Sequence, residues 1–188
     1  GGRLLIAAGQ SNIAASNEAA AGGDLTVDPR IRFWNGTTWV TCDVGSASLN
    51  WASQPGRNNI AFQAAKQALR EGVPCVYVVL DAHPGNTIDQ WIPNASTGTN
   101  GPNMTSLLTK VSAAMGAAEI ALAGITGASG FIWGQGENNG GASFDFEAYK
   151  ARWDWIKVKL RAQSWFPATT PITALSMPPQ FSSRVMDR

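Results

Sequence analysis

Residues Cys75–Leu80 read Cys-Val-Tyr-Val-Val-Leu, a stretch that is apolar at every position and rich in β-branched side chains. A strand with one face in water alternates polar and apolar residues, whereas a parallel strand covered by helices on both faces is apolar throughout. The stretch therefore predicts a buried central strand of a parallel sheet.

Helical patterns lie on both sides of this stretch. Residues 58–71 carry apolar side chains at helical spacing and are followed by Gly72 and Pro74, a usual stop signal. Residues 104–123 and 146–160 repeat apolar side chains in steps of three and four, so each predicts an amphipathic helix that packs on a core. The apolar faces of these two helices consist of Met104, Leu107, Leu108, Val111, Met115, Ala118 and Leu122, and of Phe146, Tyr149, Trp153, Ile156 and Leu160.

Three further short apolar runs between turn residues predict strands. They are residues 3–8, 130–133 and 172–176. Residues 31–41 predict a hairpin, because Asn35-Gly36 supplies the positive-φ residues that a tight turn needs. The alternation of strands and helices is typical of a single α/β domain over residues 1–188, with a central parallel sheet in a three-layer α/β/α arrangement.

Composition limits the classes of function. The chain has 188 residues, of which 44% are hydrophobic and 14% charged, and its formal net charge is +1. Disorder requires lower hydrophobicity and higher net charge. A nucleic-acid surface requires a basic stripe, and a membrane-spanning helix requires about 18 consecutive apolar residues; the sequence offers neither. With one histidine, a metal site built from several histidines is excluded.

The two cysteines, Cys42 and Cys75, leave two interpretations open. They are small apolar residues with free thiols, or they form a single disulfide bond, which favours an oxidising compartment. Their spacing matches no zinc or redox motif.

Polar turns that carry glycine follow three of the predicted strands. They are residues 9–12 (Gly-Gln-Ser-Asn), 83–91 (His-Pro-Gly-Asn-Thr-Ile-Asp-Gln-Trp) and 133–139 (Trp-Gly-Gln-Gly-Glu-Asn-Asn). In an open parallel sheet, ligands bind at the carboxyl ends of the strands. We therefore expect the three turns to meet at one edge of the sheet and to form an active site.

Each turn holds candidate catalytic residues. Ser11 is a nucleophile, or the N-cap of a helix. Gly85 presents its backbone N–H to an oxyanion, or is an ordinary turn glycine. The side-chain amide of Gln135 completes an oxyanion hole. Glu137 orients a histidine, or is a solvated loop residue.

Together these turns resemble the motifs of the SGNH hydrolase superfamily, and more narrowly those of the sialate O-acetylesterase and acetylxylan esterase group. Residues 9–12 match the Gly-Gln-Ser-Asn nucleophile motif of that group. Residues 85–91 resemble its Gly-Gly-Thr-Ser-Ile-x-x-Trp block, with Pro84 in place of the first glycine. Residues 133–137 match its Trp-x-Gln-Gly-Glu block, and residues 29–34 resemble the stretch between the first two blocks.

The resemblance implies a flavodoxin-like SGNH fold and a serine esterase that removes O-acetyl groups from a carbohydrate, with no metal or organic cofactor. It implies that Ser11 attacks the acyl carbonyl, and that the Ser11 N–H, the Gly85 N–H and the Gln135 amide bind the oxyanion. A histidine would be the general base, held by Glu137 or by an aspartate shortly before that histidine. The substrate is expected beside the side chains of Gln10, Asn12, Asn86, Trp91 and Asn138.

The sequence departs from the family at the histidine. The family's histidine lies in an Asp-x-x-His block near the C-terminus, and this sequence has no histidine after His83. Three explanations are open. The domain lacks its C-terminal block because the chain is truncated, or the protein is a non-catalytic relative, or His83 is the base, since it leaves the same strand end as Gly85. Without a base, a serine hydroxyl is nearly inert.

Other classes of function also stay open. A non-catalytic relative would be a saccharide-binding or structural module, for example in a phage tail fibre. Trp51, Trp91 and Trp133 either stack on sugar rings or pack in the core, because tryptophan is mostly buried. A lipase or thioesterase of the same superfamily fits the polar, Asn-rich turns less well, and the Gly-x-Ser-x-Gly motif of α/β-hydrolases is absent. Carbohydrate acetyl esters are mostly extracellular, which predicts a secreted or virion-associated protein. The oligomeric state is not indicated.

Overall fold

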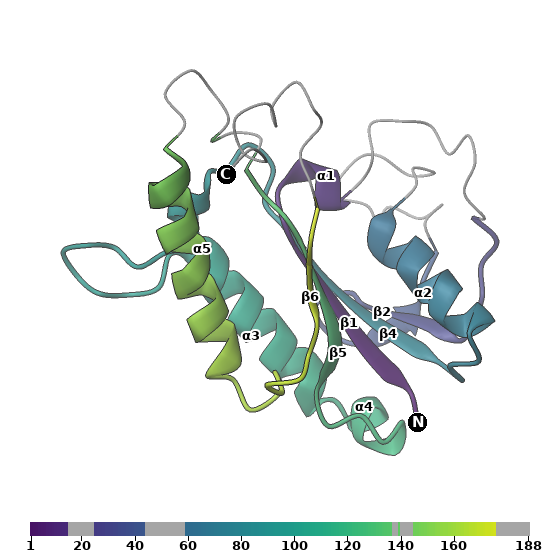
Figure 1. Cartoon of the computed structure of the whole chain (residues 1–188). Coiled ribbons are helices and arrows are strands. Elements are labelled where there is room, and N and C mark those ends of the chain that lie inside the picture. The colour runs from purple at the N-terminus through teal and green to yellow at the C-terminus, as the bar shows by residue number, and fades with distance from the viewer. Residues whose placement is uncertain (15–24, 44–58, 137–138, 140–144, 176–188) are drawn as a thin grey trace.

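The computed structural model describes residues 1–14, 25–43, 59–136, 139 and 145–175, which form a sheet between two layers of helices (Figure 1). The strands are β1 (Arg3–Gly9), β2 (Ile31–Trp34), β3 (Trp39–Thr41), β4 (Val76–Ala82), β5 (Ala128–Gly134) and β6 (Ile172–Ala174), in the sheet order β3-β2-β4-β1-β5-β6. The helices are α1 (Ser11–Ala14), α2 (Ile60–Arg70), α3 (Pro102–Gly116), α4 (Ala118–Leu122) and α5 (Phe146–Arg161), with the 3-10 turn η1 (Ile88–Gln90).

β4 is the central strand that the apolar stretch predicts. Its residues Val76–Asp81 are all buried, and it pairs in parallel with β1 on one side and with β2 on the other. β1 pairs in parallel with β5, and β5 with β6. β3 runs antiparallel to β2 in the predicted hairpin around Asn35 and Gly36. The sheet is therefore mostly, rather than wholly, parallel.

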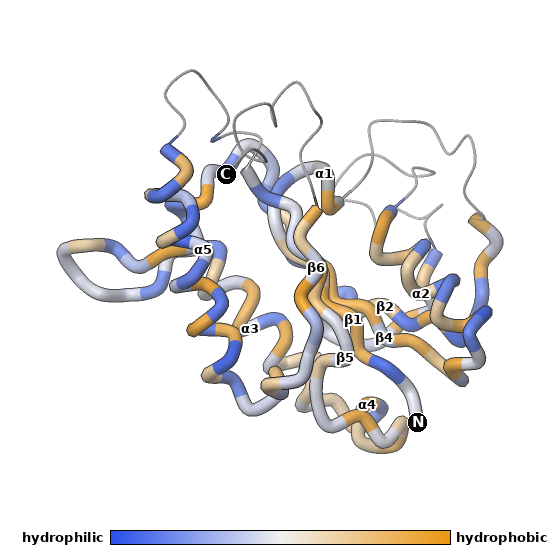
Figure 2. Tube along the Cα trace, in the orientation of Figure 1, coloured by the Kyte–Doolittle hydropathy of each residue, from blue (hydrophilic) through white to orange (hydrophobic). Residues whose placement is uncertain are grey.

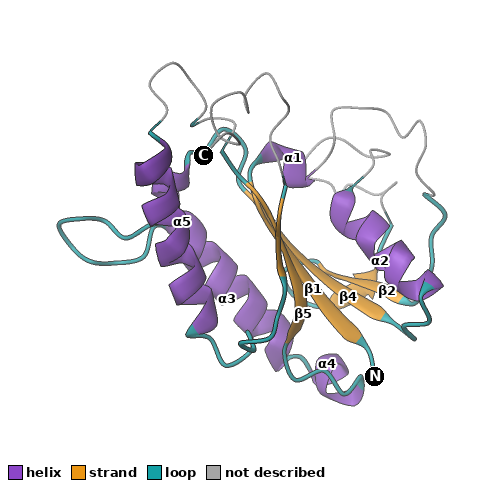
Figure 3. Cartoon of the chain, in the orientation of Figure 1, coloured by secondary structure: helices purple, strands orange, loops and turns teal. Residues whose placement is uncertain are grey.

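Two hydrophobic clusters join the helices to the sheet. On one face, α3 and α5 bury residues such as Met104 and Leu160. On the other face, α2 buries Phe62 and Leu69. Figure 3 shows these helices on opposite sides of the strands, and in Figure 2 apolar colour runs along the sheet. No helix in the described part of the chain is long and apolar enough to cross a membrane.

α2 shows how local sequence sets the ends of an element. The side chain of Asn59 caps its first turn, where Oδ1 accepts hydrogen bonds from the N–H groups of Ala61 at 2.9 Å and Phe62 at 3.3 Å. Gly72 follows the helix with φ +91°. That conformation suits glycine, so the chain leaves the helix there without strain.

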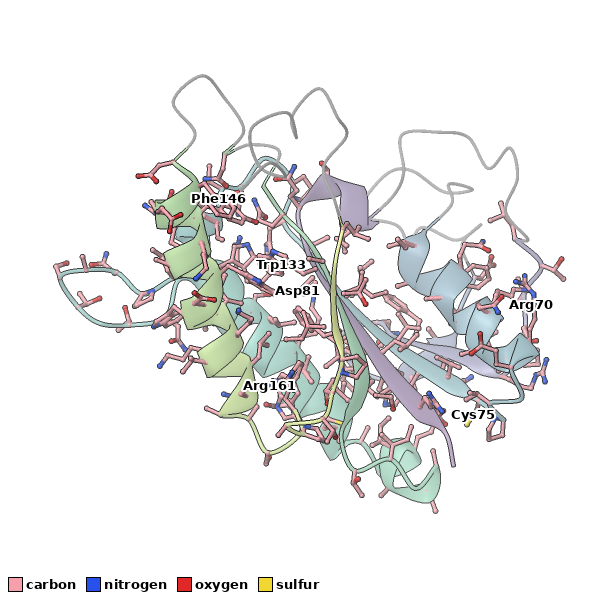
Figure 4. All side chains as sticks on the ribbon, in the orientation of Figure 1. Arg70, Cys75, Asp81, Trp133, Phe146 and Arg161 are labelled. Carbon is pink, nitrogen blue, oxygen red and sulfur yellow. The ribbon has the colours of Figure 1, made fainter. Side chains whose placement is uncertain are left out.

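The predicted helix over residues 104–123 is broken. Ala117 is extended (φ −71°, ψ 136°) between α3 and α4. The chain changes direction there, so Leu122 is 88% exposed instead of packed in the core. Phe146, also expected in the core, is the first residue of α5 and is exposed at the end of that helix (Figure 4), whereas Ile156 further along is buried.

The last two strands differ in length from the prediction. β5 extends beyond residues 130–133 at both ends, from Ala128 to Gly134. β6 ends at Ala174. Ser176, predicted as its last residue, lies outside the described residues.

Cys42 and Cys75 are free thiols, so the disulfide interpretation is wrong. Cys42 is buried in the cluster that α2 covers. Burial, helped by the charge of Asp43, raises the pKa of its thiol to about 12. Cys75 is half-buried directly before β4. The interpretation as two buried, small apolar residues with free thiols is therefore confirmed for Cys42, whereas Cys75 is free but only half-buried.

β1 and β5 approach each other at their carboxyl ends without intervening side chains. Gly9 has φ +144°, and a Cβ on this residue would lie 2.0 Å from the carbonyl oxygen of Gly134. The Gln10 N–H donates to that same carbonyl oxygen at 2.8 Å. The chain therefore turns sharply after β1.

Gly9→Ala should destabilise the protein far more than the matched change Gly72→Ala. Both glycines have positive φ, but nothing lies within 4 Å of the Cβ position of Gly72. We expect Gly72→Ala to cost about 1–2 kcal/mol from backbone conformation alone. Gly9→Ala should cost at least about 3 kcal/mol, because backbone must also move apart. Urea denaturation measures both losses, and equal losses would contradict the close approach of the two strands.

Candidate functional site

The three polar turns leave the sheet side by side. The parallel register places Gly9 of β1 opposite Ala82 of β4 and opposite Gly134 of β5. The residues that follow each strand therefore start at the same level, at the edge where α1 lies in Figure 1. The prediction that these turns share one edge is confirmed.

Ser11 is exposed at the first position of α1. The turn at Gly9 directs the chain away from the sheet just before it. Ile13 is fully buried under the same short helix, and its N–H donates to the carbonyl oxygen of Gln10 at 3.0 Å. Ile13 thus anchors α1 to the core while Ser11 stays accessible.

Gly85 lies in a tight turn directly after β4. Pro84 precedes it, its φ is +75°, and the Asn86 N–H donates to the His83 carbonyl oxygen at 3.4 Å. Proline at the second position and a positive-φ glycine at the third are typical of a type II turn. Gly85 is exposed, and nothing lies within 4 Å of its Cβ position. Its backbone is therefore open to a ligand.

The side chain of Gln135 joins all three turns from inside. It is 6% exposed. Its Nε2 donates to Oε1 of Gln10 at 3.0 Å and to the carbonyl oxygen of Asn86 at 2.7 Å. Both amide hydrogens are thus in use, so Gln135 donates to an oxyanion only after releasing one of these acceptors. Tyr149 of α5 donates to the Gln135 carbonyl oxygen at 2.7 Å and fixes the backbone there.

Two buried side-chain amide atoms of this hydrogen-bond network have no partner among the described residues. They are Oε1 of Gln135 and Nδ2 of Asn103. Asn103 lies in the first turn of α3, and its Oδ1 accepts from Nδ2 of Asn86 at 3.1 Å. No sequence pattern points to Asn103, because its contact with Asn86 spans 17 residues. The interior of the site therefore keeps hydrogen-bonding capacity that buried groups normally satisfy.

A buried carboxylate lies beneath the Gly85 turn. Asp81 of β4 is 1% exposed, and Figure 4 shows it with Trp133 between the sheet and α5. Its Oδ2 lies 3.0 Å from Nε2 of His83. Its Oδ1 accepts from the Ser106 hydroxyl at 3.1 Å and pairs with Nζ of Lys110, both from α3.

The partners of Asp81 keep its carboxyl group ionised. Burial alone would raise the pKa of Asp81, but the hydrogen bonds from His83 and Lys110 and the charge of Lys110 outweigh it. The pKa of Asp81 therefore lies below its ordinary value. The one sequence signal is an acidic residue at the end of an apolar strand, and no motif points to Lys110.

Aromatic rings fill the space behind the turns. Trp91 is fully buried and meets Trp133 edge to face, with ring centroids 4.9 Å apart. Trp133 stacks on Trp153 of α5, also at 4.9 Å. The ring of His83 meets Trp91 edge to face at 5.6 Å. Trp91 and Trp133 are therefore core residues rather than sugar-stacking surfaces.

The predicted substrate contacts divide into two groups. Asn86 is half-buried beside Gly85 at the sheet edge. Gln10 is 2% exposed and Trp91 fully buried, so neither predicted side chain lies on the surface of the site, and their contact with a substrate stays a prediction. Both support the site from within. The predicted residues Trp51, Glu137 and Asn138, and the side chain of Asn12, lie outside the described residues.

Further contacts tie the segment after β4 to its neighbours. The Ile88 N–H donates to Oδ1 of Asn139, in the turn after β5, at 2.9 Å. Asp89 accepts from Nε of Arg152 on α5 at 2.6 Å. The second and third turns are thus held in a fixed relation.

The chemistry available here is that of hydroxyl, amide and imidazole groups. In the described ranges, no group of three or more His, Cys, Asp or Glu residues could hold a metal ion. The charged pairs are Asp81–Lys110 in the interior and Asp89–Arg152 at the rim. An exposed serine, open backbone donors and a carboxylate-bound imidazole together suit acyl transfer.

Solved structures with the same fold include a protein of Arabidopsis thaliana, with a TM-score of 0.69 and 15% sequence identity over 92% of this chain and 73% of that one. NanS has a TM-score of 0.63 and 16% identity, over 97% of this chain and 69% of its own. A carbohydrate acetylesterase from Xanthomonas citri has a TM-score of 0.53 and 19% identity, over 92% and 40%. These likenesses show a mixed α/β fold around a mostly parallel sheet. No family model matches the chain, and no curated protein does.

Asp81→Asn should destabilise the protein at neutral pH and progressively less in acid. The folded-state pKa of Asp81 lies below the ordinary value of 3.8, so the ionised carboxylate stabilises the fold above pH 3.8. This stabilisation is lost as the pH falls through the folded-state pKa. We expect a loss of about 3 kcal/mol at neutral pH, because a buried charge pair is broken.

Urea denaturation across the acid range tests this expectation. Asp154→Asn is the matched control, since Asp154 pairs with Lys150 and Lys157 on the surface of α5, and exposed pairs contribute little. A loss in Asp81→Asn that stays constant as the pH falls below 3.8 would contradict the assigned direction of the pKa.

Proposed function

We propose that this chain is a serine esterase of the SGNH type that removes O-acetyl groups from a carbohydrate. The observation that carries the proposal is that Ser11, two residues after β1, and Gly85, which follows the neighbouring strand β4, are both exposed at the same sheet edge. The motif resemblance supports it. The likeness of fold to NanS and to a carbohydrate acetylesterase supports it further.

The proposed reaction has two halves. Ser11 Oγ attacks the acetyl carbonyl carbon while its proton passes to a general base, and the backbone N–H groups of Ser11 and Gly85 hold the oxyanion. The bond to the sugar oxygen then breaks, and that oxygen takes the proton from the base. Water attacks the acetyl group on Ser11 with help from the same base, which releases acetate and restores the serine.

Gln135 has two roles in this proposal. It holds the first and second turns together through Gln10 and Asn86. It becomes a third oxyanion donor when the developing charge displaces one of those acceptors. Removing one donor of this kind typically lowers the rate by ~10²–10³.

The general base is a histidine in this proposal. The resemblance assigns it to a C-terminal Asp-x-x-His block, held by that aspartate or by Glu137. His83 is the histidine that these 188 residues contain. Its Nε2 faces Asp81 at 3.0 Å, so Nδ1 is the nitrogen left for proton transfer.

A carbohydrate suits the polar rim of this edge. Amide side chains of Asn86, Asn12 and Asn138 would hydrogen-bond the hydroxyl groups of a sugar. Because carbohydrate acetyl esters are mostly extracellular, we propose that the protein is secreted or virion-associated.

A saccharide-binding module is the second candidate function. It is favoured by the Gln135 amide, whose two hydrogens are both bound by neighbouring turns. If the Gln135 amide keeps these two partners, it does not donate to an oxyanion. The polar edge of the sheet would then bind a sugar without catalysing a reaction. This candidate predicts binding of acetylated saccharides with no acetate release.

Ser11→Ala should abolish acetate release from acetylated xylan, acetylated sialic acid and 4-nitrophenyl acetate. The expected loss is at least about 10³-fold, because no nucleophile remains. Ser164→Ala is the matched control, since Ser164 is an exposed serine between α5 and β6. A fluorophosphonate probe should add one adduct to the wild type, at Ser11. Hydrolysis that survives in Ser11→Ala would reject the esterase proposal, and saccharide binding without hydrolysis would favour the binding module.

A further inference from the structure

The Gly85 turn is held at both ends, and Asp81, Asn103 and Lys110, which take part in holding it, lie outside the motifs. We propose that Asp81 and Lys110 position the Gly85 backbone for oxyanion binding, by clamping His83, the residue from which the turn starts. They are positioning residues rather than catalytic ones. The inference rests on the proposed function, because it assigns the Gly85 N–H to an oxyanion.

His83 is held through its backbone and through its ring. Its N–H donates to the Gly9 carbonyl oxygen at 2.8 Å, and its own carbonyl oxygen accepts the Asn86 N–H that closes the turn. Its Nε2 lies 3.0 Å from Oδ2 of Asp81. The ring meets that of Trp91 edge to face, with the ring centroids 5.6 Å apart. The first end of the turn is thus fixed to β1 and to the interior of the site.

Lys110 connects this anchor to a helix. Its Nζ reaches from α3 to the end of β4, where it donates to the Leu80 carbonyl oxygen at 3.1 Å and pairs with Asp81. Asp81 and Lys110 are 29 residues apart in the sequence. Because Asp81 stays ionised, it accepts a hydrogen bond from Nε2–H of His83 and holds the ring in one orientation.

The second end of the turn is anchored to the same helix. The carbonyl oxygen of Asn86 accepts a hydrogen bond from Nε2 of Gln135. The side-chain Nδ2 of Asn86 donates to Oδ1 of Asn103 at 3.1 Å. Asn103 and Lys110 both belong to α3 and are two helical turns apart, so they lie on the same side of it. One rigid helix therefore holds both ends of the turn.

A glycine turn needs such anchors if its N–H is to serve catalysis. Gly85 has no side chain to restrict its backbone, and it is exposed. An oxyanion donor must lie about 2.7–3.1 Å from the developing charge. A displacement of about 1 Å, caused by a change far from the reacting atoms, lowers a rate by about 10²-fold.

Lys110→Met tests the clamp without altering any group that touches the substrate. We expect kcat for acetyl ester hydrolysis to fall by about 10- to 100-fold. KM should change by less than about twofold, because the ground state is bound by other groups. Lys110→Arg should restore most of the loss, since the guanidinium also reaches an anionic partner. Lys150→Met is the control, because it removes a lysine from an exposed pair with Asp154.

Rates are measured at a temperature where thermal unfolding shows every variant folded. If Lys110→Met does not fold, Ser106→Ala replaces it, since Ser106 also donates to Asp81; its kcat should fall by about fivefold with KM unchanged. If the folded variant keeps the kcat of the wild type, or changes only in KM, the proposed positioning role of Asp81 and Lys110 is rejected, while the proposed esterase function still stands. If the wild type shows no hydrolysis that depends on Ser11, the proposed esterase function is rejected, and the positioning role of Asp81 and Lys110 is rejected as well.

Discussion

The backbone of Gly9 lies so close to the carbonyl group of Gly134 that no side chain fits between them. This contact ends β1 and β5 at the same level and turns the chain out of the sheet before Ser11. It also places Gln10 beside Gln135, so that their side chains bond across the two turns. The exposed serine and the interior that supports it both depend on this approach, which glycine alone permits at Gly9.

The site is built from polar groups that bind one another beneath an exposed rim. Asp81 lies inside the apolar end of β4 and is compensated by Lys110 and His83. Gln135 lies between the first and second turns and is tethered by Tyr149 of α5. Such interiors contribute little net stability, because their desolvation offsets their attraction. They fix geometry instead, which is what catalysis by backbone donors requires.

Much of the fold can be predicted because its signals are local. The apolar run of β4, the stop signal at Gly72 and the hairpin turn at Asn35-Gly36 each depend on neighbouring residues, and all three agree with the structure. The meeting of the three turns follows from parallel pairing. The break at Ala117 has only a weak local signal, because the preceding Gly116 is an isolated glycine of the kind that helices tolerate, and Leu122 lies beyond this break.

The interior of the site was beyond prediction because polar partners are chosen by tertiary contact. Asp81 finds Lys110 across 29 residues. A tryptophan in a motif either stacks on a sugar ring or packs in the core, and its neighbours in the folded protein determine which of the two it does. Trp91 is covered by Trp133 and His83, so it belongs to the core.

The stacked rings of Trp133 and Trp153 have an optical consequence. Their planes differ by 21° and their centroids lie 4.9 Å apart, close enough for the indole transitions to couple as an exciton pair. Trp133 lies near the end of β5, two residues before Gln135. Trp153 belongs to α5, the helix that also contains Tyr149. Trp133 lies equally close to Trp91, so the near-ultraviolet circular dichroism of the three rings together would change, rather than vanish, if α5 moved away from the site.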